Sequence, residues 1–179
     1  MVYILMAHGF EAIETITPWD MLIRADIPVK SVSITGERVV TSSQGIDVAT
    51  DLLFEDVDFS DAEMIILPGG QPGSENLFLH SGVKKLLEEA VNRGSYVAAI
   101  CAAPTVLGRH GLLEGRKVTV YPGCESALGG AIYTDVMVQQ DENIITGRGP
   151  AAAVEFARRI IRVLRGIETE EIVCERMTF

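Results

Sequence analysis

The sequence predicts a single α/β domain over residues 1–179, with a doubly wound, mostly parallel sheet and helices on both faces. Short apolar runs of strand length alternate along the chain with segments of helical periodicity, the order that generates a helix-covered parallel sheet. These runs are almost wholly apolar, as expected for strands buried on both faces. A chain of 179 residues with 47% hydrophobic content suits one domain with a substantial core.

The first half of the chain predicts two strands, a helix and an edge hairpin. Residues 2–7 form an apolar run, and residues 28–35 alternate as a strand does. A Ser-Ser-Gln-Gly turn within residues 39–51 predicts a short hairpin. Residues 11–25 have helical periodicity, in which Pro18 either kinks the helix or starts a second one. The face expected to be buried carries Ile13, Ile16, Met21 and Leu22.

The second half predicts further strands and helices in alternation. Residues 64–67 form a buried strand that ends in a glycine-rich loop, residues 68–73, for which no regular structure is expected. Two helices are expected, at residues 83–92 and 151–164. The pattern of the tail, residues 168–179, predicts neither a helix nor a strand. Further strands are expected at residues 95–100, 117–121, 132–138 and 144–146, the last two joined by a hairpin at Asp-Glu-Asn.

The net charge and amino-acid composition of the chain indicate which classes of binding partner to expect. The chain has 25 acidic and 15 basic residues, a formal net charge of −10, which repels phosphate backbones and anionic membranes. We therefore expect no nucleic-acid and no membrane partner. No basic leader precedes the first apolar run, and no run nears the roughly 20 residues of a membrane span, so we expect a cytoplasmic protein. Three widely spaced cysteines predict neither a disulfide framework nor a metal site.

Cys101 lies on a predicted strand-to-helix turn, between the strand at residues 95–100 and a helix that begins at residue 102 and closes near residue 111. Pro104 suits the first turn of that helix because its missing N–H has no partner there. This geometry resembles a nucleophile elbow, in which the helix N-terminus favours a thiolate. The alternative is a small buried hydrophobic residue. An exposed strand-end position predicts that Cys101 is the most reactive of the three thiols.

Several other chain segments leave the sheet at the same edge as Cys101. In a parallel sheet the carboxyl ends of the strands meet, so residues 8–14, the Gly69-Gly70 loop and Tyr121 are expected near the thiol. This convergence favours a catalytic or redox cysteine over a structural one. His8 leaves the first strand there, and we expect it to orient the loop rather than to catalyse. His80 and His110 are expected to be solvated surface groups.

Four stretches of the sequence together resemble the signatures of the ThiJ/PfpI superfamily, in its DJ-one branch. They occur in the order and spacing of the family and cover the chain from the first strand to about residue 164. The stretches are Gly-Phe-Glu-Ala-Ile-Glu-Thr at residues 9–15, Leu-Pro-Gly-Gly at 67–70, Ala-Ala-Ile-Cys-Ala-Ala-Pro at 98–104 and Thr-Gly-Arg-Gly-Pro at 146–150.

The resemblance implies a flavodoxin-like fold of the class I glutamine amidotransferase-like kind, usually as a homodimer. It implies that Cys101 is the nucleophile and oxidation sensor and that Glu14 is the carboxylic acid beside the sulfur. Gly69 and Gly70, with the backbone N–H of Ala102, would form the oxyanion-binding pocket. Arg24 would lie toward the dimer-side opening.

The resemblance also implies an activity without a cofactor or metal, on a small reactive carbonyl substrate. Family activities include conversion of 2-oxoaldehydes to hydroxy acids (glyoxalase), deglycation of early adducts, a chaperone role and oxidative-stress sensing. Tyr121 stands where many relatives have a histidine near the sulfur, and a phenol is a poor base at neutral pH. A PfpI-type peptidase is disfavoured because Ala102 follows the nucleophile where that branch has histidine.

Two hypotheses of different class follow. In the first, the chain is a glyoxalase or deglycase in which Cys101 adds to the aldehyde and Glu14 moves the proton. In the second, the chain is a stress sensor or redox-dependent chaperone in which Cys101 is oxidised to sulfinate. Because a carboxylate and a thiolate in one buried pocket repel each other, the pair is expected to share one proton. We expect Glu14, which follows an apolar run, to hold it.

Overall fold

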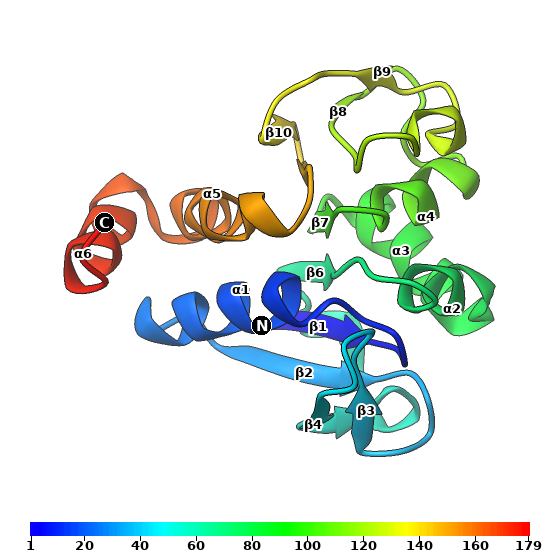
Figure 1. Cartoon of the computed structure of the whole chain (residues 1–179), viewed down its shortest axis with the longest axis horizontal. Coiled ribbons are helices and arrows are strands. Elements are labelled where there is room, and N and C mark those ends of the chain that lie inside the picture. Colours follow the sequence, from blue (N-terminus) through cyan, green and yellow to red (C-terminus); the bar gives the residue numbers. More distant parts are fainter.

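The computed structural model describes residues 1–179 and has a seven-stranded central sheet with helices on both faces (Figure 1). Six strands are parallel, and only the edge strand β10 runs antiparallel to its neighbour. This arrangement confirms the predicted doubly wound, flavodoxin-like fold. In spatial order the strands are β10 (Val138–Asp141), β11 (Ile144–Gly147), β7 (Tyr96–Ile100), β6 (Met64–Leu67), β1 (Val2–Met6), β2 (Val29–Ser33) and β5 (Leu52–Leu53).

Each face of the sheet carries its own hydrophobic core. Successive residues of β7 alternate between them: Val97 packs into one core and Ala98 into the other, because neighbouring side chains of a strand point to opposite faces. Figure 1 shows the two helical layers on either side of the sheet. One layer consists of α1 (Ala12–Arg24), α5 (Ala153–Arg165) and α6 (Ile167–Arg176), and the other of α2 (Gly73–Leu79), α3 (Ser81–Arg93) and α4 (Pro104–Arg109).

Short elements complete the chain outside the main sheet. The predicted edge hairpin is confirmed as an antiparallel pair of strands, and a second small sheet follows α4. The hairpin consists of β3 (Val39–Thr41) and β4 (Asp47–Ala49), the small sheet of β8 (Lys117–Val118) and β9 (Ile132–Tyr133), and the 3₁₀ turns are η1 (Phe54–Asp56), η2 (Phe59–Asp61), η3 (Glu125–Ala127) and η4 (Pro150–Ala152).

Helix α1 corrects the prediction of its buried face. The helix is continuous through Pro18, so no second start occurs. Its inward positions follow the spacing of Glu14, Pro18 and Met21, which places residues on one side of a 3.6-residue helix. Ile13 and Ile16 lie on the other side and are 53% and 40% exposed. The inward face therefore begins with a carboxyl group rather than with the two isoleucines.

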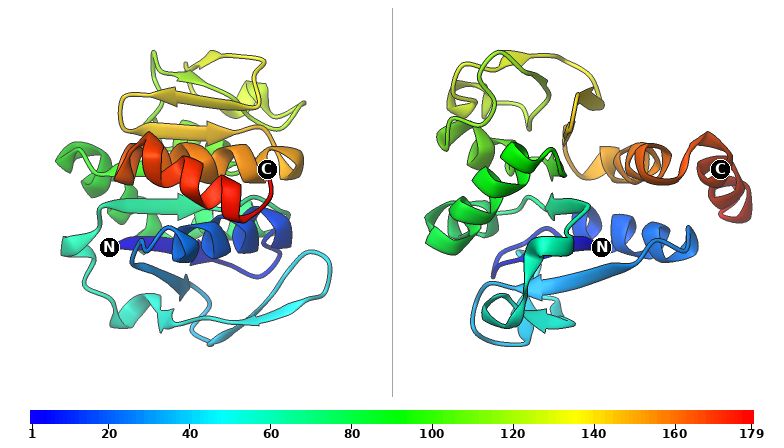
Figure 2. Two further views of the ribbon diagram at one scale, coloured as in Figure 1. Left: turned by 90° about the vertical axis from the view of Figure 1, so that its left-hand side faces the viewer. Right: turned by 180° about the vertical axis from the view of Figure 1, so that it is seen from behind.

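The second half departs from prediction in three segments. Residues 68–72 of the glycine-rich loop have no helix or strand, as predicted, but the chain enters α2, a helix that was not expected, at Gly73. The strands expected at residues 117–121 and 132–138 contain only two residues each, β8 and β9, and they pair outside the main sheet. The tail forms α6, which lies outside α5 (Figure 2). No helix has the length and apolarity to cross a membrane.

Ion pairs across α5 and α6 explain why the tail is ordered. The Glu170 side chain, which is 1% exposed, accepts from Arg158 at 2.7 Å and from Arg162 at 2.6 Å. Both guanidinium groups come from α5, and both lower the pKa of Glu170 against the effect of burial. A buried carboxylate with two charged donors holds the helices in one register.

Candidate active site

Cys101 lies on a sharp turn between β7 and α4, as predicted. Its backbone φ of 64° is in the left-handed region, which costs a non-glycine residue about 1 kcal/mol or more. Two backbone hydrogen bonds hold the turn: the Cys101 N–H donates to Gly147 O, and its carbonyl accepts from the N–H of Tyr121, both at 2.9 Å. Pro104 is the first residue of α4. The chain therefore keeps a strained residue at the carboxyl end of the sheet.

Glu14 lies beside Cys101, in the first turn of α1. The side chain is fully buried, and its Oε2 accepts a hydrogen bond of 2.9 Å from the backbone N–H of Gly69. Its Oε1 is also buried and has no nitrogen or oxygen partner, and the carboxyl is in hydrogen-bond contact with the Cys101 thiol. Burial of a carboxyl oxygen without such a partner costs free energy. Glu14 Oε1 therefore offers a hydrogen-bond acceptor, or an acidic proton, next to the thiol.

Gly69 and Gly70 bring the loop after β6 against both groups. A Cβ at Gly69 would lie 2.5 Å from Glu14 Oε2 and 2.6 Å from Cys101 Cβ, so no side chain fits between them. Gly70 has a φ of 90°, and its N–H and that of Ala102 act on the Cys101 sulfur. The structure therefore corrects one predicted role: the Gly69 amide is donated to Glu14, and the donors near the sulfur belong to Gly70 and Ala102.

Burial raises the pKa of both acidic groups of the site, Glu14 and Cys101. The pKa of Glu14 is raised to about 7: burial is the largest cause, the charge of Glu11 also raises it, and the hydrogen bonds with Cys101 and Gly69 partly oppose the rise. Burial raises the pKa of Cys101 to about 12, and the charge of Glu14 adds to that shift. The raised pKa of Glu14 allows a proton on the carboxyl, but the higher pKa of Cys101 places a single shared proton on the sulfur, so the prediction that Glu14 holds it is wrong. The prediction that the turn favours a resting thiolate is wrong, because burial outweighs the donors of Ala102 and Gly70.

Glu11 is a site residue that the sequence analysis missed. Its Oε2 accepts from the backbone N–H of Glu14 at 2.8 Å and so caps the N-terminus of α1, which fixes the direction in which the Glu14 side chain leaves the helix. Glu11 is 9% exposed, so its charge acts on Glu14 over a short, partly buried path. The signal available in the sequence was an acidic residue three positions before the first inward residue.

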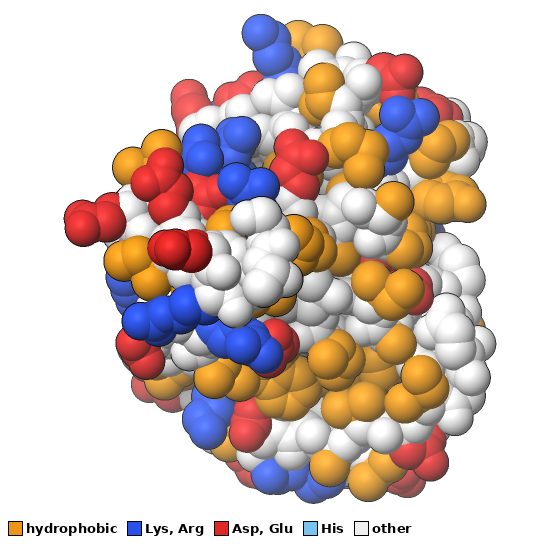
Figure 3. Space-filling model, turned by 60° about the vertical axis from the view of Figure 1, so that its left-hand side comes forward, with side chains coloured by type: hydrophobic (Ala, Val, Ile, Leu, Met, Phe, Trp, Pro, Cys, Tyr) orange, Lys and Arg blue, Asp and Glu red, His pale blue; other side chains and the backbone are white.

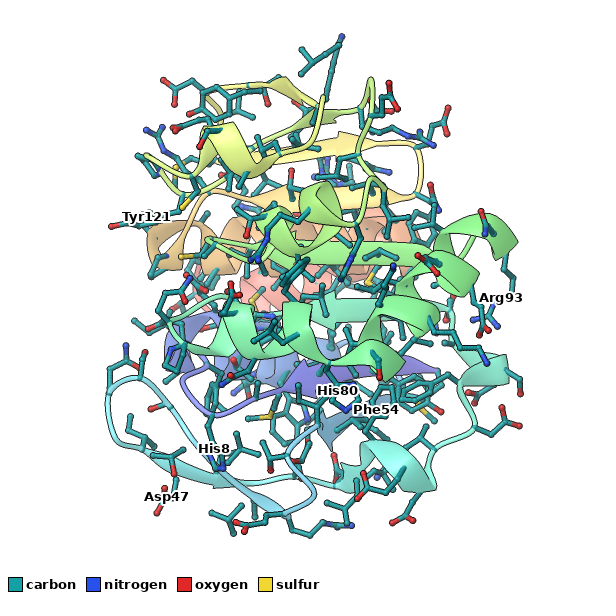
Figure 4. The ribbon with its side chains drawn as sticks, turned by 90° about the vertical axis from the view of Figure 1, so that its right-hand side faces the viewer. His8, Asp47, Phe54, His80, Arg93 and Tyr121 are labelled. Atoms are coloured by element: carbon teal, nitrogen blue, oxygen red, sulfur yellow. The ribbon has the colours of Figure 1, made fainter.

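Two predicted pocket residues do not face Cys101. His8 is exposed, accepts a hydrogen bond from the Thr41 N–H at 3.1 Å, and lines a different cavity with Asn76 and His80; its loop-orienting role is consistent with these contacts. Figure 4 shows His8 apart from Tyr121 along the same edge of the molecule. Arg24 pairs with Asp20 at 2.7 Å at the far end of α1, about 15 Å along the helix from Glu14 at 1.5 Å per residue.

The remaining histidines are not solvated surface groups, contrary to prediction. His80 caps α3 by accepting from the Val83 N–H and packs against Phe54. His110 stacks on Phe78, and its Nε2 is buried with no partner. Burial lowers the pKa of His110, because an imidazolium would lose its water there. His80 thus packs the start of α3 against η1, and His110 packs the end of α4 against α2.

The exposures of the cysteines also differ from expectation. Cys101 is only 8% exposed and Cys174 7% exposed, whereas Cys124 is half-buried on a loop. The prediction that Cys101 has the exposed strand-end position is therefore wrong. No three His, Cys, Asp or Glu side chains come together in an arrangement that could hold a metal ion.

Comparison with known proteins identifies the family. A model of the DJ-1/PfpI family matches residues 1–163. The chain belongs to the DJ-1/PfpI family. It is 36% identical over 169 residues to the Parkinson disease protein 7 homolog of Danio rerio. The aligned residues cover 92% of this chain and 89% of the relative. The match confirms the resemblance inferred from the four sequence stretches.

Two further comparisons bear on fold and activity. A structure titled Toxoplasma gondii DJ-1, oxidized, superposes with a TM-score of 0.95 at 32% identity and covers 99% of this chain and 97% of that one. A Caenorhabditis elegans protein named glutathione-independent glyoxalase DJR-1.2 is 35% identical over 159 residues, 88% of this chain and 84% of the relative. Both relatives match nearly the whole domain.

Proposed function

We propose that this DJ-1/PfpI-family chain is a cysteine-dependent, cofactor-independent glyoxalase or deglycase that acts on small 2-oxoaldehydes or their early adducts. The observation that carries the proposal is the Glu14 carboxyl, buried beside Cys101 with one oxygen held by Gly69 and the other unpaired. A carboxyl with a pKa of about 7 gains and releases protons near neutral pH. The name of the nematode relative supports the same chemistry.

The proposed reaction begins with addition of the Cys101 thiol to the aldehyde carbon. The ionised carboxylate of Glu14, which forms as pH approaches its pKa of about 7, accepts the thiol proton and passes it to the former carbonyl oxygen as the carbon–sulfur bond forms, which gives a hemithioacetal. The N–H groups of Gly70 and Ala102, which lie toward the sulfur, stabilise negative charge on that oxygen. Because Glu14 takes the proton of the attacking thiol, the raised pKa of Cys101 does not prevent addition.

An isomerisation and a hydrolysis complete the cycle. Glu14 removes the hydrogen of the sulfur-bearing carbon and returns a proton to the adjacent carbon, while the hydroxyl proton moves to the ketone oxygen. The product is a thioester of the 2-hydroxy acid. Water then breaks the carbon–sulfur bond, which releases the acid and restores the thiol. The oxidation of one carbon balances the reduction of its neighbour, so no external oxidant or reductant is needed.

The activity is tested by measuring lactate formed from methylglyoxal. We expect turnover by the wild-type chain and loss of turnover in both Cys101→Ser and Glu14→Gln, because glutamine keeps an acceptor for the Gly69 N–H but cannot take up the thiol proton. Stoichiometric loss of aldehyde without lactate would refute the proposal. Release of free amine from a methylglyoxal-treated peptide distinguishes deglycase from glyoxalase activity.

A second candidate function is oxidative-stress sensing through Cys101. The unpaired Glu14 Oε1 and the two amides near the sulfur are suited to hold the oxygens of a sulfinic acid. Two equivalents of peroxide supply these oxygens and leave as two waters. Mass spectrometry after dilute peroxide treatment tests this function: a gain of two oxygens confined to Cys101 supports it, and oxidation first at Cys124 contradicts it.

We also propose that the chain acts as a homodimer in the cytoplasm, with the outer face of α1 at the contact. Ile13, Ile16 and Ile23 are 53%, 40% and 57% exposed on this face, and exposed apolar patches mark interaction surfaces. Figure 3 shows hydrophobic side chains gathered in the lower half of this side of the molecule. Light scattering tests the proposal: we expect a dimer at micromolar concentration and a monomer for Ile16→Asp.

A further inference from the structure

An apolar recess of about 230 Å³ lies next to the strand-to-helix turn of the site. Its walls are Tyr121, Pro122, Met137 and residues 148–152. The Tyr121 ring closes one side, since its Cδ2 would lie 3.3 Å from a Cβ placed on Gly149. The ring is 48% exposed and stands at the edge of the molecule (Figure 4). The ring therefore packs close to Gly149, where any side chain would crowd it.

Both walls of the recess are joined to the backbone of the nucleophile. The N–H of Tyr121 donates to Cys101 O at 2.9 Å, and Gly147 O, one residue before the second wall begins, accepts from the Cys101 N–H at 2.9 Å. The Tyr121 wall is thus one hydrogen bond from the Cys101 backbone, and the other wall begins one residue after Gly147. The recess therefore adjoins the turn that carries the Cys101 sulfur, and the sulfur itself is not part of its lining.

The recess differs in chemistry from the other cavities. The single charged residue in its lining, Arg148, is paired with Asp135 at 2.6 Å, and its backbone N–H donates to Met137 O. The other three cavities are lined by charged or histidine side chains, including Lys85 in one and Arg159 in another. A neutral apolar ligand group therefore suits this recess and loses nothing there by leaving water.

We infer that the recess is the subsite for the substituent of the 2-oxoaldehyde, and that it selects aryl or branched alkyl groups over methyl. The inference rests on the proposed glyoxalase function and specifies its substrate class. Its volume of about 230 Å³ exceeds the roughly 150 Å³ of an apolar cavity that binds benzene. A phenyl ring therefore fits, whereas the methyl group of methylglyoxal leaves most of the recess to water. Tyr121, a poor base, serves as the apolar wall.

The test compares phenylglyoxal with methylglyoxal by the ratio of their kcat/KM values in wild type and variants. Tyr121→Ala removes one wall and Ala151→Leu fills the recess, so both should lower the ratio about tenfold. That change equals about 1.4 kcal/mol, roughly the effect of burying two methylene groups. Ile132→Ala, an exposed residue outside the recess, is the matched control and should leave the ratio unchanged.

The outcomes separate this inference from the proposed function. Absence of lactate from methylglyoxal and of mandelate from phenylglyoxal in wild type refutes both. Turnover of both aldehydes with the same ratio in wild type, Tyr121→Ala and Ala151→Leu refutes the subsite alone. A ratio that falls in both variants but not in Ile132→Ala supports it, and thermal unfolding of each variant verifies that the fold is intact.

Discussion

The buried carboxyl of Glu14 makes the stability of this protein depend on pH in an unusual direction. Its pKa is raised from 4.5 to about 7, with burial as the largest cause. The folded chain therefore binds this proton more tightly than the unfolded chain does. The stabilisation is fully present below pH 4.5 and is lost as pH rises through 7. At about 1.36 kcal/mol per pKa unit, ionisation of Glu14 costs about 3 kcal/mol by pH 8.

Replacement of Glu14 by glutamine isolates this effect. Glutamine retains an oxygen for the Gly69 N–H, which donates to Glu14 Oε2 at 2.9 Å, but it does not titrate. We expect the free energy of unfolding of wild type, relative to Glu14→Gln, to fall by about 3 kcal/mol between pH 5 and pH 8. Glu14→Leu leaves the Gly69 N–H without its acceptor and should be destabilised by about 1–3 kcal/mol at every pH.

Urea unfolding followed by circular dichroism, in steps of half a pH unit, measures this difference. Subtraction of the variant curve removes the contribution of His110, whose lowered pKa weakens the fold as pH falls below about 6.5. The range ends at pH 8 because Cys101 titrates above it. A wild-type curve parallel to that of Glu14→Gln, or one that rises between pH 6 and pH 8, would refute a protonated carboxyl in the native pocket.

Three other predictions concern packing, ion pairs and reactivity. Gly69→Ala should abolish turnover and destabilise the fold by more than about 2 kcal/mol, because its Cβ would overlap Glu14 Oε2 and Cys101 Cβ. Gly94→Ala, with open space around it, should cost only about 1 kcal/mol and keep activity. Glu170→Ala should lower the free energy of unfolding, measured by thermal unfolding, by at least about 2 kcal/mol, because Arg158 and Arg162 lose their shared partner. Glu168→Ala, at an exposed position, should change that free energy by no more than about 0.5 kcal/mol. A bulky maleimide should label half-buried Cys124 before the nucleophile, as peptide mapping would show; prior labelling of the nucleophile contradicts the observed burial.

The local pattern of apolar and polar residues was enough to predict much of the fold. Apolar runs such as residues 64–67 are buried strands because an almost uninterrupted apolar segment has no solvent-facing side, whatever its neighbours. The turn at Cys101 was also a local matter, since an apolar strand, a short link and Pro104 leave few other geometries. Motif order along the chain then sufficed for the family and for the pairing of Cys101 with Glu14.

The tertiary structure decided what depends on distant neighbours. Ile13 and Ile16 appeared suited to the core, yet the sheet meets the side of α1 that carries Glu14, and helical periodicity alone does not say which of two semi-apolar faces turns inward. The tail gave no clear pattern because the contacts that order α6 come from arginines of α5. The pattern of residues within the tail does not include those arginines and so could not predict the helix.

The sequence by itself determined which chemical groups meet at the carboxyl edge of the sheet, and the tertiary structure decided how each is used. The motif predicted that Gly69 lies beside the thiol, but only the tertiary structure shows that the Gly69 N–H donates to Glu14. The same holds for the thiol, whose pKa is raised to about 12 although its turn predicted a thiolate. Desolvation and hydrogen-bond partners depend on every atom packed around a group, and those atoms come from the whole length of the chain.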